Sequence, residues 1–336
     1  MKKLFYILPL VCLMFACKKE SSTPEEEQIT PIAGKSNTVF FVDTFRVYAT
    51  DLAGNNKKLI LDEDVKSGNN YIMNIDFATS KKLVYTYKPE TNTKQEIRII
   101  NADGTDKKTI KTLASTTTSF DFIASFGNKI LYTTLDYNGT SPVLDIRWMD
   151  ENGANDAKVN WPKPTIAARD GSGYLSINSN YGITVPTHNI YRVKIVNGVF
   201  AETNSFNVPT ITGVIRGSAL SSDGNTFIYL LAPTYTSDKY DVMSLDLSKK
   251  DGATKKIMTY ELPKTGDGAL SYPQNVKLTF ANGTANVIIS YGVQVSTNRY
   301  ATKDDYYFFQ SIDVEKATLA NKWKIFNEYG GSHIVD

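Results

Sequence analysis

Residues 96–109 read EIRIINADGTDKKT: an apolar run, a turn that contains glycine, and a second run rich in Lys and Thr. The same arrangement occurs at residues 46–59, RVYATDLAGNNKKL, and at residues 145–158, DIRWMDENGANDAK. Glycine beside Asp or Asn between apolar runs is typical of a turn that joins two β-strands, because glycine readily takes positive φ angles. The repeated unit therefore predicts a β-hairpin that recurs along the chain.

The repeat has a long and nearly constant period. Weaker copies lie at residues 190–198, 240–252 and 307–314. The turn glycines stand at positions 54, 104, 153, 198 and 252, so successive copies are separated by 50, 49, 45 and 54 residues. A unit of this length has room for four short strands and their turns, and such self-similarity is typical of a repeat architecture. From Asn37 onward the apolar residues follow strand periodicity rather than helical periodicity.

A second element precedes most copies of the hairpin. Ile75-Asp76-Phe77 parallels Phe120-Asp121-Phe122, and Ser222-Asp223-Gly224 lies in the turn that precedes a later apolar strand. Together with Asp51-Leu52-Ala53-Gly54, these residues resemble the TolB-like, or WD40-like, propeller repeat. That repeat has a Ser-Pro-Asp-Gly turn before an apolar strand and a later strand that ends in Asp-x-x-Gly; the family's proline is absent here. The resemblance covers about residues 38–330 and implies a β-propeller.

Six copies predict an all-β fold, a six-bladed β-propeller with four-stranded antiparallel blades. One blade cannot bury both of its faces, so neighbouring blades must stack and the ring must close. The first copy lacks its innermost strand, and the last copy is followed by a tail at residues 330–336. We therefore predict that strands from both ends of the chain share one blade. A pair of β-sandwiches is the alternative, but it requires no such repeat.

The N-terminal residues have the composition of an export segment. Met1-Lys2-Lys3 precedes an apolar stretch that is shorter than the roughly 20 residues of a membrane-spanning helix, which predicts a signal peptide over residues 1–16. Residues 14–17, MFAC, resemble the lipobox of bacterial lipoproteins, with Cys17 as the lipid-bearing residue. Residues 17–35 are then a polar, flexible tether and residues 36–336 the propeller domain.

This N-terminal resemblance implies a cellular location for the protein. Polar tethers of this kind are similar to those of lipoproteins from Bacteroidota, so we expect an outer-membrane lipoprotein of the bacterial cell envelope, on the periplasmic or the surface face. The membrane would then be a partner through the lipid anchor. Simple secretion without an anchor is the alternative.

Composition excludes several classes of function. The chain has 37 Lys and Arg against 35 Asp and Glu, a formal charge of +2, and removal of Lys2 and Lys3 with the signal peptide leaves 37 − 2 = 35 basic residues. A chain with balanced charges is not expected to bind nucleic acid. Two Cys and two His cannot supply a cysteine-based zinc cluster or a three-histidine site, and no P-loop or nucleophile elbow is present. We expect no metal and no cofactor.

Asp76 and Asp121 are the candidate ligand-binding residues. Their matching positions would place both on the innermost strands, where they would bind a cation or a polar ligand, or act as an acid/base pair. The alternative is that they accept backbone hydrogen bonds between blades. Ala219 and Lys277, which stand at the corresponding positions of later copies, favour this alternative because they interrupt any ring of carboxylates.

Two other groups of residues have both a functional and a structural interpretation. The Asp-Gly and Asn-Gly turns suggest calcium loops, but their spacing differs from that of an EF-hand and favours plain hairpin turns. The aromatic residues either stack on sugars or fill the core, and their number favours the core; the pairs and runs concerned are Tyr306-Tyr307-Phe308-Phe309, Tyr235 with Tyr240, and Tyr291 with Tyr300. His188 and His333 have no partner at ligand spacing.

The sequence thus favours a monomeric, lipid-anchored binding module for an envelope protein or glycan, and it marks no catalytic residue. An envelope glycan hydrolase or lyase with carboxylates near the channel is the alternative. A purely structural surface protein is a third possibility.

Overall fold

The computed structural model describes most of the chain from Thr38 to Val335. The described ranges are 38–63, 71–78, 81–89, 94–126, 129–139, 143–159, 173–177, 181–186, 189–196, 199–207, 213–221, 223–234, 237–249, 254–261, 274–281, 285–293, 306–320, 322–326 and 333–335. Between residues 173 and 207 it describes the backbone only. The signal peptide, Cys17 and the tether lie outside these ranges. In the part that is described, no helix has the length and apolar character needed to cross a membrane.

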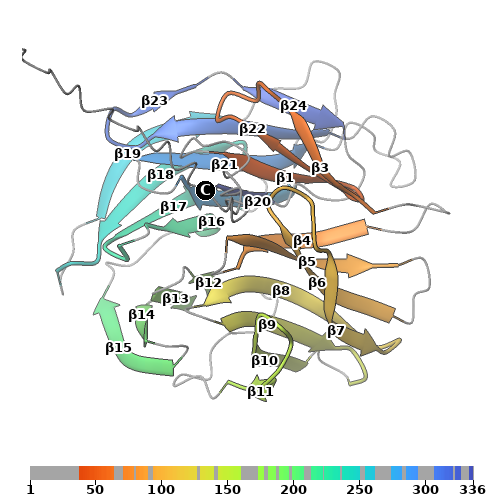
Figure 1. The fold of residues 1–336 in the computed structure, drawn as a ribbon. Helices are drawn as coiled ribbons and strands as arrows, with labels where there is room; N and C mark the ends of the chain where they lie inside the picture. The colour runs from red at the N-terminus through yellow and green to blue at the C-terminus, as the bar shows by residue number, and fades with distance from the viewer. Residues whose placement is uncertain are drawn as a thin grey trace, which may run out of the picture. The chain divides into compact units, whose positions relative to one another are not determined.

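The described strands form six antiparallel sheets (Figure 1). The first contains β25 (His333–Val335), β1 (Val39–Asp43), β2 (Arg46–Thr50) and β3 (Lys58–Asp62). The second contains β4 (Tyr71–Phe77), β5 (Lys82–Lys88), β6 (Lys94–Asn101) and β7 (Lys108–Ala114). The third contains β8 (Thr118–Phe126), β9 (Lys129–Asp136), β10 (Val143–Asp150) and β11 (Ala157–Lys158).

The later sheets repeat this meander. The fourth contains β12 (Gly173–Ile177), β13 (Tyr181–Pro186), β14 (Asn189–Val196) and β15 (Val199–Asn207). The fifth contains β16 (Val214–Leu220), β17 (Thr226–Ala232), β18 (Lys239–Asp246) and β19 (Thr254–Glu261). The sixth contains β20 (Gln274–Phe280), β21 (Asn286–Val293) and β22 (Tyr306–Asp313); β23 (Thr318–Leu319) and β24 (Trp323–Phe326) pair with different parts of β22.

The first strands of the sheets contact one another in a closed order. β4 contacts β8, β8 contacts β12, β12 contacts β16, β16 contacts β20, β20 contacts β25, and β25 contacts β4. This is the arrangement of a β-propeller, in which the first strand of each blade lines a central channel. The fold is therefore an all-β propeller with four-stranded antiparallel blades, and the sandwich alternative is wrong. We call β4, β8, β12, β16, β20 and β25 the inner strands.

The first sheet is assembled from the two ends of the described chain. Val335 pairs with Val39, Ile334 with Phe40 and His333 with Phe41. β25 takes the place of the inner strand that the first repeat lacks, so the prediction of a blade shared by both ends is confirmed. β25 is the last described strand, so the first sheet contains both the first and the last strands of the described chain.

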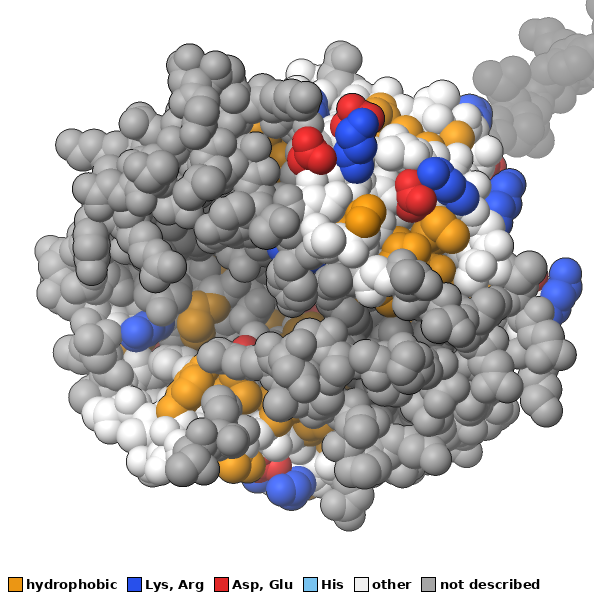
Figure 2. Space-filling view, turned by 180° about the vertical axis from the view of Figure 1, so that it is seen from behind, with side chains coloured by type: hydrophobic (Ala, Val, Ile, Leu, Met, Phe, Trp, Pro, Cys, Tyr) orange, Lys and Arg blue, Asp and Glu red, His pale blue; other side chains and the backbone are white. Residues whose placement is uncertain are grey.

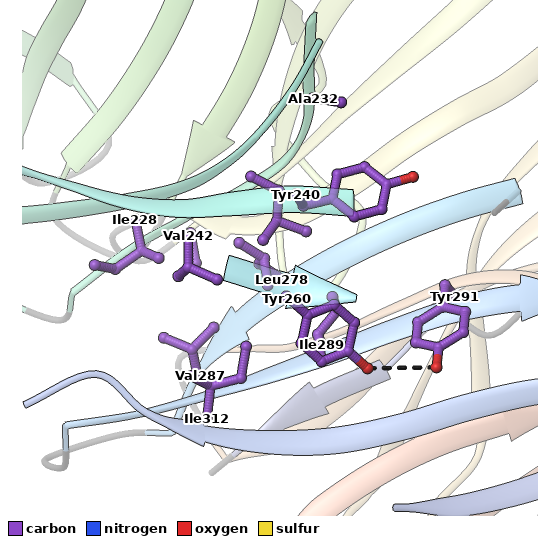
Figure 3. Packing of buried hydrophobic residues seen from close by; sticks show 12 residues of the cluster. Ile228, Ala232, Tyr240, Val242, Tyr260, Leu278, Val287, Ile289, Tyr291 and Ile312 are labelled. Carbon is purple, nitrogen blue, oxygen red and sulfur yellow. Dashed lines mark hydrogen bonds between the residues drawn. The ribbon is translucent and has the colours of Figure 1, made fainter. Parts of the chain in front are cut away.

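The hydrophobic core lies between the sheets rather than under one of them. One cluster joins the first and second sheets, another the second and third, and a third the fifth and sixth. Figure 3 shows this last cluster, in which the Tyr260 hydroxyl from β19 donates a hydrogen bond of 3.3 Å to the Tyr291 hydroxyl from β21. Phe41, Phe309 and Trp323 join the first sheet to the sixth; the Phe309 and Trp323 rings are stacked with centroids 4.3 Å apart.

Three glycine turns lie against a neighbouring sheet. Gly54, Gly104 and Gly153 have φ angles of +82°, +94° and +83°, so the hairpin-turn prediction is confirmed for these three copies. A Cβ at Gly104 would overlap the carbonyl oxygen of Ile60 on β3, and one at Gly153 would overlap that of Ile110 on β7. A Cβ at Gly54 would strike the Trp323 ring of the last sheet.

Candidate functional site

The charged residues of the inner strands are few and are sorted by sign. β4 contains Asp76 and β8 contains Asp121, whereas β16 contains Arg216 and β20 contains Lys277. β12, which lies between the acidic and the basic pair, has the uncharged sequence GYLSI. Asp121 is exposed, and the side chains of Asp76, Arg216 and Lys277 are partly exposed.

The strand pairing is irregular at the same level of four inner strands, and in β20 it skips Asn275 and Val276. In the other three strands a single extra residue forms a β-bulge. The extra residue is Met73 in β4, Asp121 in β8 and Arg216 in β16, because the strand pairing skips each of them. A bulge adds a residue that has no opposite residue in the strand pairing, and it turns that side chain away from the regular alternation of the strand. The bulges therefore give Asp121 and Arg216 equivalent positions in two different sheets.

Asp76 lies deeper along its strand, and both of its oxygens accept hydrogen bonds. The Phe77 N–H donates to Oδ1 at 2.8 Å, and the Ser125 N–H on β8 donates to Oδ2 at 2.9 Å. Burial raises the pKa of Asp76 to about 6, although the backbone N–H of Ser125 and the charge of Lys277 oppose the rise. This is the structural interpretation considered for Asp76, a carboxylate that accepts backbone hydrogen bonds between blades.

The equivalence of Asp76 and Asp121 is wrong. Asp76 pairs with Val84, and the corresponding residue of the third sheet is Ala124, which pairs with Leu131. Asp121 occupies the bulge instead, three residues nearer to the start of its strand. The shared Asp-Phe sequence does not mark equivalent positions, because its distance from the next strand differs between the two copies. Asp76 precedes Lys82 by six residues, and Asp121 precedes Lys129 by eight.

Lys277 brings the sixth sheet close to Asp76. Burial lowers the pKa of the Lys277 ammonium, and the negative charge of Asp76 opposes this. β25 stands between β20 and β4 in the order of the inner strands, so these two charges approach each other from strands that are not neighbours. Asn74, on the same strand as Asp76, donates its side-chain N–H to the carbonyl oxygen of Asp121 at 3.1 Å.

Two ionic networks between sheets, one around a buried and one around a partly buried carboxylate, were not predicted from the sequence. Glu63, which follows β3, is 4% exposed and accepts from Arg98 at 2.6 Å, from Lys107 at 3.0 Å and from the Tyr85 hydroxyl. In the next pair of sheets, Asp156 accepts from Lys111 at 2.5 Å, Arg147 at 3.0 Å and Tyr132 at 2.8 Å. Arg98 and Arg147 hold the same place in the repeated hairpin, and that recurrence is the sequence pattern that could have revealed the networks.

The other candidate residues fall into two groups. Tyr240, Tyr291 and Phe309 are buried, as the core interpretation predicts. Tyr235, Tyr300 and His188 lie outside the described residues, as do the side chains of Tyr306, Tyr307 and His333. Within the described ranges no three His, Cys, Asp or Glu residues are grouped so that they could hold a metal ion.

Charges of both signs occur among the described residues at the surface. On the face shown in Figure 2, Lys and Arg side chains lie next to Asp and Glu side chains. Among the ion pairs on described strands are Arg46 with Asp62 at 2.9 Å and Lys239 with Glu261 at 2.7 Å.

Solved structures share this fold at low sequence identity. TolB from Acinetobacter baumannii superimposes with a TM-score of 0.54 at 16% identity; the match covers 89% of this chain and 66% of that one. A protein described as TolB from Agrobacterium tumefaciens gives 0.50 at 10% identity, over 88% and 90% of the two chains. A luciferin-regenerating enzyme gives 0.50 at 8% identity, over 86% and 87%. No family model and no curated protein matches the sequence.

Proposed function

We propose that this protein is a lipid-anchored β-propeller of the bacterial cell envelope that acts as an interaction module for a protein or a glycan. The observation that carries the proposal is that the two inner-strand carboxylates do not converge. Asp76 accepts two backbone N–H groups, and Asp121 lies at another level of the neighbouring strand. A glycosidase needs two carboxyl groups that flank one bond, whereas a binding surface does not.

The module that we propose is a single closed ring of six blades. Two features support this number: the closed order of contacts among the six inner strands, and the repeated docking of a glycine turn on the preceding sheet. In that docking Gly54 meets Trp323, so the first sheet follows the sixth in the same way that the second follows the first.

The anchor and the location in the envelope are part of the proposal. They are supported by the apolar N-terminal stretch that ends at Cys17 and by a fold like that of the TolB proteins. The test is Cys17→Ala in the full chain, produced in a bacterium of the Bacteroidota type. We expect the wild type to fractionate with membranes and to incorporate labelled fatty acid, and the variant to lose both properties. A variant that keeps its lipid and its membrane fraction would overturn the anchor.

The partner is tested by crosslinking the full chain in intact cells. We expect one envelope protein or glycan to be captured by the wild type and by Lys249→Gln, a change on the exposed β18–β19 turn, and to be lost with Asp121→Asn combined with Arg216→Gln. Capture that is the same for all three chains would place binding away from the inner strands and contradict the proposal.

The enzyme alternative has one observation in its favour, since a luciferin-regenerating enzyme shares the fold. A fold hosts many activities, so this bears on the architecture and not on the chemistry. Release of reducing ends from envelope glycans by the wild type, abolished in Asp121→Asn, would favour the hydrolase over the binding module.

A further inference from the structure

We propose that the channel binds a zwitterionic ligand, an amino acid or a short peptide with both ends free, whose ammonium faces Asp121 and whose carboxylate faces Arg216 and Lys277. This inference rests on the ring of the proposed function, and it names the ligand class of the same module. It follows from the sorting of charges by sign around the inner strands.

The order of the strands divides the channel wall into two arcs. β4 and β8 are neighbours and supply only acidic charges, and β16 and β20 are neighbours and supply only basic charges. β12 separates the arcs on one side and β25 on the other. In a ring of six, β4 stands opposite β16 and β8 stands opposite β20, so each acidic strand faces a basic one.

The bulges set two of these charges at one level. Asp121 and Arg216 are the extra residues at the same register position of β8 and β16. Bulges are common beside binding sites because they redirect a side chain without changing the rest of the strand. Asp121 is exposed and Arg216 partly exposed, so this level is accessible from solvent.

Lys277 pairs with Ser290 and so lies beside the bulge level on β20, whereas Asp76 pairs with Val84 and lies two residues deeper on β4. Asp76 and Lys277 lie close enough for each to influence the pKa of the other, and burial shifts both pKa values toward the neutral form. Water therefore screens charges poorly around them, and a ligand charge would act strongly on both groups. A simple cation would be repelled by the basic arc and a simple anion by the acidic arc, which leaves a ligand with both charges as the best match.

The experiment measures binding of four probes to the full chain in detergent by titration calorimetry. The probes are triglycine, N-acetyl-triglycine, triglycine amide and N-acetyl-triglycine amide, which present both charges, the anion, the cation and neither. We expect triglycine to bind at least about tenfold more tightly than either singly blocked form. Equal binding of all four probes, or no binding, would overturn the proposal.

Variants assign the two ends of the ligand. Arg216→Gln and Lys277→Gln should remove the preference for a free carboxylate, and Asp121→Asn the preference for a free ammonium. The matched controls are Arg46→Gln, Lys255→Gln and Asp246→Asn, which lie on other strands and should leave both preferences unchanged. Preferences that survive in the channel variants, or disappear equally in the controls, would contradict the site.

The result is independent of the lipid anchor and of the captured partner. If triglycine fails to bind while Cys17 still anchors the chain and the crosslink persists, only the ligand class is wrong. If Cys17→Ala leaves the chain on the membrane while triglycine binds as expected, the anchor is wrong and the channel site stands.

Discussion

Gly104 satisfies two separate requirements of the backbone. Its φ of +94° favours glycine, and a Cβ there would overlap the Ile60 carbonyl oxygen of the neighbouring sheet. Asp106, two residues later, also has a positive φ, of +54°, but it already carries a Cβ. The two positions therefore separate the effect of backbone conformation from the effect of close approach.

Replacing both residues by asparagine tests this separation. Asn tolerates positive φ better than most residues with a side chain. We expect Gly104→Asn to lower the free energy of unfolding by about 1–3 kcal/mol, because the overlap with Ile60 remains, and Asp106→Asn to change it by less than about 0.5 kcal/mol. Urea denaturation measures both. Equal effects would show that conformation alone explains the glycine.

Asp76 should make stability depend on pH in an unusual direction. Burial raises its pKa from the ordinary value of 3.8 to about 6, so between these values the folded chain binds more protons at this group than the unfolded chain does. The contribution of Asp76 to the free energy of unfolding therefore falls as pH rises through that window. Asp76→Asn should remove this slope in urea midpoints recorded from pH 4 to pH 7.

An exposed turn residue provides the opposite control. The Ser221 hydroxyl and the Asn225 N–H lower the pKa of Asp223, so the contribution of this group is lost as pH falls toward its folded pKa. Asp223→Asn should therefore change the pH dependence of urea midpoints recorded below pH 3.8, in the direction opposite to the effect of Asp76→Asn between pH 4 and pH 7. Slopes of the same sign for the two variants would disprove the assignment.

At the scale of strands and turns, the outermost strand contains a β-bulge in four of the described sheets. Its pairing with the third strand skips Ile60, Ile110, Ala201 and Ile257 in four of the sheets. Ile60 and Ile110 are the residues whose carbonyl oxygens meet the glycine of the next turn. The bulge and the glycine thus form one docking contact between successive sheets.

Several elements could be predicted from the sequence because each has a local cause. Gly54, Gly104 and Gly153 mark turns that need positive φ, and the missing strand before Val39 requires a replacement from elsewhere. The bulges at Asp121 and Arg216 were not predictable, since an extra residue changes the register without changing the composition. For the same reason, the shared Asp-Phe sequence suggested that Asp76 and Asp121 are equivalent, whereas the strand pairing places them at different register positions.

The strand contributed by the C-terminal residues should be essential for stability. Deleting residues 331–336 removes β25 and leaves β1 without its inner partner and without three cross-strand pairs. We expect a fall of at least about 10 °C in the melting temperature, which corresponds to a few kcal/mol at this chain length. Deleting residues 18–35, which supply none of the described strands, is the control. A melting temperature that is unchanged by the first deletion would contradict the closure.

At the scale of the whole molecule, sheets are joined by ions as well as by apolar side chains. Glu63 of the first sheet meets Arg98 and Lys107 of the second, and it is almost fully removed from solvent. Removing one member of a buried pair leaves the other charge uncompensated, which costs more than loss of an exposed pair.

The exposed Arg46–Asp62 pair offers a matched comparison. Its distance of 2.9 Å is close to that of Arg98 and Glu63, but its side chains are 42% and 40% exposed. We expect Glu63→Gln to lower the free energy of unfolding by about 3 kcal/mol or more and Asp62→Asn by less than about 1 kcal/mol. Urea denaturation in low and high salt measures both, and similar losses would mean that burial of Glu63 adds nothing.

Because β25 pairs with β1, the first sheet can be completed only after both strands have been synthesised. Val39 is synthesised nearly three hundred residues before Val335, so β1 lacks its pairing with β25 until Val335 has been added. Until then its inner edge is an unpaired strand edge, which is the kind of surface that recruits other chains. A chain released before β25 is synthesised would therefore expose this edge of β1 to pairing with other chains.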